Sequence, residues 1–87
     1  GRPDRFIAAG GLLVSLADWG LARKAALDVA AAAAASSLPA GDLAGIAALF
    51  TTGRRQRRDP VDLARAVVEE LPRATTIRQL REKTLYE

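Results

Sequence analysis

The sequence predicts an all-α protein, a compact bundle of four to five short helices with dimerisation as an added expectation. Alanine, the best helix former, is abundant, and β-branched residues are few. Proline and glycine fall mainly between the apolar stretches, where they end one helix and begin the next. A length of 87 residues suits a single small domain.

The first helix is expected from Pro3 to about Trp19. Proline suits a first helical turn, and the following Asp4 favours the positive end of the helix dipole. Two neighbouring apolar stripes are expected to face the core: Phe6, Gly10, Leu13 and Ala17 on one, and Ile7, Val14 and Leu21 on the other. Because glycine costs helical stability, the Gly10-Gly11 pair predicts a close backbone crossing or a bend, with a loop as the alternative.

The second helix is expected from Leu21 to about Ser36, after a break at Gly20, and it contains six consecutive alanines. Such a run is typical of a tightly packed or simply soluble helix. A connection of seven residues then leads to a third helix that ends near Phe50. This third helix has one clean apolar face, formed by Leu43, Ile46, Ala47 and Phe50.

A basic loop, residues 53–59, is expected between an apolar half and a cationic half of this single domain. Gly53 would end the third helix, and Asp59 with Pro60 would start the fourth, which runs to about Leu71. The last helix is expected to start with a capping box, formed by Thr76 and the glutamine three residues later, and to proceed toward Tyr86.

Charge is distributed unevenly along the chain. Residues 1–50 carry four basic and four acidic side chains, whereas residues 51–87 carry nine basic and six acidic ones. The whole formal net charge of +3 therefore lies in the second half. An acidic partner, if there is one, would bind that half.

The composition argues against several function classes. The chain has no cysteine and no histidine, which excludes disulfides, the common zinc motifs and the usual nucleophilic dyads and triads. The carboxylates form no acid/base pair, and the glycines match no phosphate-binding loop. We therefore expect a protein that is not an enzyme, with no cofactor, no metal and no small-molecule substrate.

The sequence also bears on location and context. The uncharged run Phe6 to Ala17 has twelve residues, short of the roughly 20 that span a bilayer, so no membrane span is expected. The lack of cysteine is compatible with a cytoplasmic location. The abrupt start at Gly-Arg-Pro and the end in mid-pattern lead us to expect a segment of a longer polypeptide.

The first functional hypothesis is a non-enzymatic protein–protein interaction module. The first three helices carry few charges, and a helix that is apolar most of the way round is either central in a bundle or covered by another chain. Since not every helix of a small domain is central, we expect a homodimer or a docking partner. The residues expected at or beneath this interface are Leu13, Val14, Leu43, Ile46 and Phe50.

The alternative hypothesis is nucleic-acid binding, led by the cluster Arg54, Arg55, Arg57 and Arg58. Its five-residue stretch Arg-Arg-Gln-Arg-Arg resembles the arginine-rich motif of viral RNA-binding peptides, and residues 55–58 resemble a furin-type cleavage site. Guanidinium groups beside a helix N-terminus suit a phosphate or carboxylate. A merely solvated basic loop accounts for the same pattern.

The last two helices, residues 60–86, add to the nucleic-acid hypothesis. Residues 63–80 resemble a helix-turn-helix motif, with an alanine in the first helix and Thr-Ile-x-x-Leu opening the second. The resemblance implies contacts with bases or phosphates from the start of the second helix, at Thr75, Thr76, Arg78 and Gln79. The chain departs from the pattern at the turn, which has Pro72 instead of glycine and is one residue too long.

Overall fold

The computed structural model describes residues 2–85, and all regular structure within this range is helical. The predicted all-α bundle is confirmed, and Tyr86, the expected end of the last helix, lies outside the described residues. The elements in chain order are α1 (Arg2–Trp19), α2 (Arg23–Ala35), the 3-10 helix η1 (Ala40–Gly45), α3 (Ile46–Arg55), α4 (Pro60–Glu70) and α5 (Ile77–Leu85). No helix within residues 2–85 combines the length and apolar character needed to cross a membrane.

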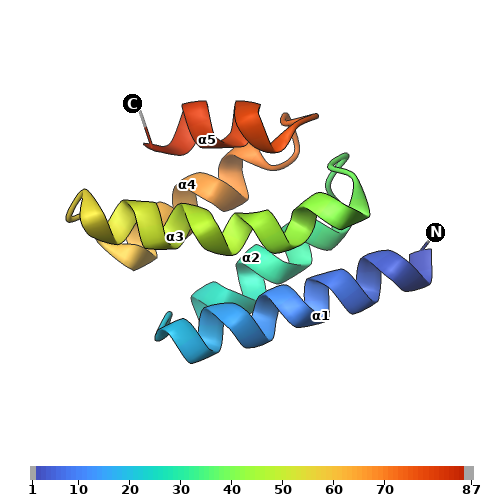
Figure 1. The fold of residues 1–87 in the computed structure, drawn as a ribbon, viewed down its shortest axis with the longest axis horizontal. Helices are drawn as coiled ribbons and strands as arrows, with labels where there is room; N and C mark the ends of the chain where they lie inside the picture. Colours follow the sequence, from blue (N-terminus) through green and yellow to red (C-terminus); the bar gives the residue numbers. More distant parts are fainter. Residues whose placement is uncertain (1, 86–87) are drawn as a thin grey trace.

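The first two helices form an antiparallel pair (Figure 1). The chain reverses at Gly20, whose φ of +105° is a backbone conformation that favours glycine. The amide of Leu21 donates to the carbonyl of Leu16 at 3.0 Å, and Gly20 donates to Ala17 at 3.0 Å. These two bonds form a Schellman motif, which ends α1 within one turn.

The core lies where α3 crosses the middle of the molecule, with α1 on one side and α5 on the other, and with α2 and α4 behind it (Figure 1). Side chains from all six elements and the connections between them form one hydrophobic cluster. Its largest fully buried members are Phe50, Leu12, Leu16, Leu38, Leu43, Ile46, Leu49, Leu63, Leu71 and Leu80.

Helix α1 buries a different face from the one predicted. Its buried residues are Ala9, Leu12 and Leu16, whereas Phe6, Ile7 and Val14 of the expected stripes are exposed. Both faces of this helix are apolar, so periodicity alone does not say which one packs inward. Which face packs inward depends on how closely Leu12 and Leu16 pack against α2, η1 and α3, and this is decided by tertiary contacts.

The Gly10-Gly11 pair makes neither a bend, a loop nor a close crossing within the chain. α1 is one continuous helix through both residues, and both are exposed. A Cβ atom built on either glycine would meet nothing within 4 Å. The cost of glycine in this helix, about 1 kcal/mol per residue relative to alanine, therefore has no compensation inside the fold.

The third helix starts and ends later than predicted. The segment Ala40–Gly45, which includes the expected helical residue Leu43, forms the tighter turn η1, and α3 begins at Ile46. At its other end, α3 continues past Phe50 to Arg55. The non-helical part of the expected basic loop is thus residues 56–59.

Gly53 serves packing rather than helix termination. It is buried inside α3, and a Cβ atom at this position would lie 2.5 Å from the Cδ2 atom of Leu63. Since Leu63 is itself buried in the core, any side chain at position 53 would force a rearrangement. The absence of a side chain allows α3 and α4 to approach closely.

The chain instead turns out of α3 at Arg57, which lies two residues past the end of the helix and has a left-handed φ of 61°. The amide of Arg58 donates to the carbonyl of Gly53 at 2.9 Å, and Arg57 donates to Arg54 at 3.0 Å. This is a second Schellman motif, with arginine at the position that glycine usually occupies. The positions of the glycines in the sequence therefore did not predict where α3 ends.

The predicted starts of the last two helices are confirmed. The carboxylate of Asp59 accepts from the amides of Val61 at 2.8 Å and Asp62 at 3.4 Å, with proline in the first turn of α4. Before α5, the hydroxyl of Thr76 accepts from the amide of Gln79 at 3.1 Å. The side chain of Gln79 returns to the amide of Thr75, one residue earlier than in a standard capping box.

Candidate protein-interaction surface

An apolar surface lies on the side of α1 that faces away from the core. Phe6, Ile7 and Val14 expose 68%, 74% and 58% of their surface. The exposed Gly10 lies between them, one turn after Phe6 and one turn before Val14. We call these four residues the α1 outer face.

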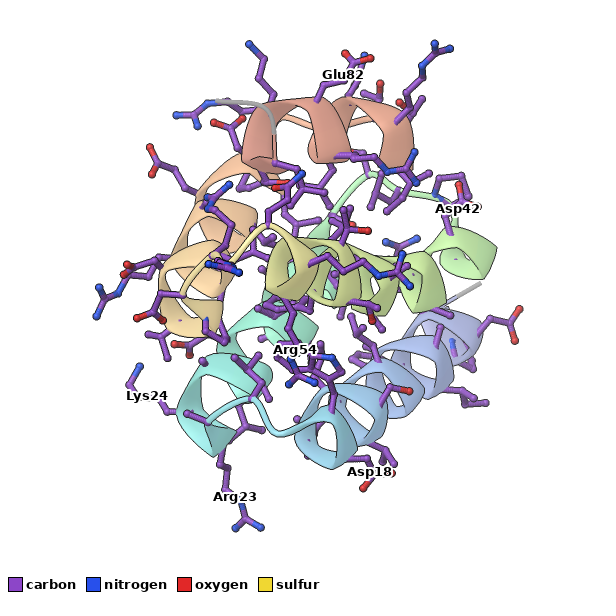
Figure 2. All side chains as sticks on the ribbon, turned by 60° about the vertical axis from the view of Figure 1, so that its left-hand side comes forward. Asp18, Arg23, Lys24, Asp42, Arg54 and Glu82 are labelled. Carbon is purple, nitrogen blue, oxygen red and sulfur yellow. The ribbon has the colours of Figure 1, made fainter. Side chains whose placement is uncertain are left out.

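The local sequence explains why this surface is uncharged. Residues 6–17 form more than three helical turns without a charged side chain, so whichever face packs inward leaves an apolar face outside. The charged residues at the two ends behave differently. Arg5 turns inward to α2, whereas Asp18 is exposed (Figure 2).

The apolar surface extends onto α2. Phe6 lines a shallow recess together with Ala34 and Ala35 near the end of α2. Leu27, which is 47% exposed, precedes Ala34 by seven residues and therefore lies on nearly the same side of that helix. All four large hydrophobic side chains that are exposed within residues 2–85 thus belong to the α1–α2 pair.

The structure separates the predicted interface residues into two groups. Val14 belongs to the α1 outer face, and Leu13 beside it is half-buried against the core. Leu43, Ile46 and Phe50 have no exposed surface, so they lie beneath the surface and a partner cannot contact them directly. Phe6 and Ile7 were expected to face the core, but both lie at the surface and belong to the α1 outer face.

A second feature is an open groove of about 410 Å³ between α2 and α4, which we call the α2–α4 groove. Alanines form much of its lining, and Val61 and Val68 lie along its α4 side. Charged side chains lie along both helices, where Lys24 pairs with Asp28 at 2.9 Å. Figure 2 shows Lys24 projecting from α2 at this side of the molecule. The full lining is Ala22, Lys24, Ala25, Asp28, Val61, Ala64, Arg65, Val68 and Glu69.

Two of the four clustered arginines bind within the fold. Arg54 stacks on the indole ring of Trp19, with 3.8 Å from its guanidinium carbon to the ring centroid, and donates to the Trp19 carbonyl at 3.1 Å (Figure 2). Arg58 donates to the carbonyl of Thr84 at 2.9 Å. Both guanidinium groups thereby satisfy carbonyls at helix C-termini, where cations are favoured.

The other two arginines, Arg55 and Arg57, are exposed and have no partner within residues 2–85. The helix N-terminus next to them is already capped, because Asp59 accepts from the free amides of α4. The four guanidinium groups and these amides therefore do not converge on one anion-binding point. Only two arginines of the cluster remain for an external partner.

The predicted base-contacting residues lie together and exposed at the start of α5. Their polar atoms bind largely to each other. Gln79 accepts from the hydroxyl of Thr75 at 2.9 Å, and Thr76 caps the helix. Arg78 lies 3.6 Å from the carboxylate of Glu82, an exposed pair that is weak in water.

Comparisons of this chain with family models, with curated proteins and with solved structures gave no match.

Proposed function

We propose that this domain is a non-enzymatic protein–protein interaction module that docks or dimerises through the α1 outer face. The observation that carries the proposal is the exposure of Phe6, Ile7 and Val14 on one side of a helix that is otherwise well packed. A monomeric soluble protein rarely exposes a contiguous apolar surface of this kind without using it.

The energetics favour a role in binding. Full burial of a large apolar side chain is worth about 1.5–3 kcal/mol, so covering three of them supplies several kcal/mol toward association. A stable interface usually buries about 800 Å² per partner, roughly one-seventh of the 5261 Å² surface of this domain. The outer face would therefore act as the anchor, with Leu27 and polar neighbours at the rim.

The exposed glycines support the same surface. Gly10 and Gly11 leave the α1 backbone uncovered, which lets a partner helix or strand approach more closely than over any other residue. The apolar side chains before and after the two glycines would lie on either side of the partner. A stabilising contact in a complex would offset the cost of these glycines in the free domain.

Replacement of both Ile7 and Val14 by glutamine tests this proposal. Glutamine is a good helix former and both positions are exposed, so the helical circular dichroism and the melting temperature should stay unchanged at concentrations where the wild type is monomeric. Light scattering should show that association of the chain weakens at least tenfold. The matched control is Thr51→Gln, an exposed helical position on α3 that lies outside the outer face.

Association that is the same in the double variant and in the wild type would contradict the proposal. Loss of association in the Thr51→Gln control as well would also contradict it, since the effect would then not belong to the outer face.

Nucleic-acid binding is the second candidate function, favoured by the exposed Arg55 and Arg57 and by the exposed start of α5. Under this hypothesis, titration with duplex DNA or RNA shows an affinity that falls steeply between two salt concentrations. Replacing both arginines by alanine then weakens binding further, whereas an affinity insensitive to salt and to this substitution contradicts the hypothesis.

A further inference from the structure

We infer that the partner of the α1 outer face is a second copy of this chain, which receives it in the α2–α4 groove. This inference rests on the proposed function and specifies its partner. The copies would join head to tail, because the two contacting surfaces are different parts of the molecule.

The apolar residues of the two surfaces match in spacing. On α1, Ile7 and Val14 are seven residues apart, and on the α4 side of the groove Val61 and Val68 are also seven residues apart. In both helices this separation is about 10.5 Å. Gly10 lies between the two α1 side chains, so a valine of the groove can contact the bare backbone there. Ile7 and Val14 would then lie on either side of that valine.

The groove suits an uncharged helix face. Its small side chains, Ala22, Ala25 and Ala64, leave room for larger ones in a groove of about 410 Å³. The alanines and valines make most of the open lining apolar, so a charge placed against them would lose water. The α1 outer face brings no charge of its own into the groove.

The charges around the two surfaces are also compatible. The exposed Asp18 follows the outer face, and the groove lining carries the cations Lys24 and Arg65 together with the acids Asp28 and Glu69. Each cation is now paired with an acid of its own helix, with Asp28 at 2.9 Å and with Asp62 at 3.3 Å. Exposed pairs of this kind contribute little, so Asp18 of a second copy can replace one of these partners at small cost.

The placement of the surfaces excludes an intramolecular contact. No residue of α1 lines the groove, which lies between α2 and α4, and the outer face points away from the core. A symmetric dimer of two outer faces would leave the groove empty. A head-to-tail contact fills both surfaces, and it leaves one free outer face and one free groove at the ends of every open chain.

Mixing two variants tests this arrangement. The face variant carries Ile7→Gln and Val14→Gln, and the groove variant carries Val61→Glu, with Ala25→Gln as an independent second groove variant. Circular dichroism confirms that each is folded. Each variant alone should be monomeric at 9.2 kDa, and an equimolar mixture of face and groove variants should form a 1:1 complex of twice that mass.

The mixture succeeds under this inference because the groove variant keeps an intact outer face and the face variant keeps an intact groove. A chain carrying both sets of substitutions is the control, and it should complement neither variant.

The outcomes separate the two proposals. If both groove variants associate like the wild type while the face variant is monomeric, the proposed function stands and the groove contact is overturned. If face and groove variants are both monomeric and their mixture remains so, the head-to-tail contact is also overturned. A face variant that associates like the wild type overturns the proposed function itself.

Discussion

Replacing Phe50 by alanine is expected to destabilise the domain by about 3–5 kcal/mol. Phe50 has no exposed surface, and its ring packs against the Trp19 ring in an edge-to-face arrangement with 5.9 Å between centroids. A domain of 87 residues has a total stability of roughly 4–13 kcal/mol, so this single loss removes a large part of it. Urea unfolding followed by the fluorescence of the single tryptophan measures the change.

The matched control is Phe6→Ala, which removes the same side chain from a position that is 68% exposed. Its effect on unfolding should stay within about 0.5 kcal/mol, although it should weaken association. Equal destabilisation by the two substitutions would contradict the assignment of one phenylalanine to the core and the other to an interface.

The second large effect is expected at Arg5, whose substitution by alanine should cost about 2–3 kcal/mol. Its guanidinium group donates to four carbonyls at and beyond the end of α2, including Ser36 at 2.7 Å and Leu38 at 2.7 Å. These bonds satisfy the free carbonyls at the end of α2 and connect that end to the start of α1. Thermal unfolding followed by circular dichroism measures the loss.

Two further variants make this prediction specific. Arg5→Lys keeps the charge but loses the planar fork, so it should recover only part of the stability. Arg23→Ala removes an exposed arginine from the other end of α2 and should change the stability by less than about 0.5 kcal/mol. Similar losses for Arg5→Ala and Arg23→Ala would show that charge, rather than capping, is responsible.

The fold was largely predictable because local signals define most of its helices. Helix propensity and the placement of proline predicted the helices, and the caps at Asp59 and Thr76 were found at the predicted residues. These interactions are made within one turn, so a single sequence contains all the information they need. The same reasoning gave the wrong end for α3, because Arg57 adopts the left-handed conformation normally associated with glycine.

The candidate site was harder to predict because it depends on which side of α1 packs inward. The pattern Phe6, Gly10, Leu13 and the pattern Leu12, Leu16, Trp19 both have helical spacing. Only the packing of the second set against the other helices decides between them. The hydrogen bonds of Arg54 and Arg58 within the fold could not be predicted either, since their carbonyl partners are 35 and 26 residues away in the sequence.

We propose that this domain associates with itself through the apolar outer face of α1, and sedimentation equilibrium of the wild-type chain from micromolar to millimolar concentration tests this proposal. The average mass should rise above the monomer value of 9.2 kDa with concentration, and it should remain at the monomer value when Ile7 and Val14 are replaced by glutamine. A wild-type chain that stays at 9.2 kDa over the whole range would contradict it.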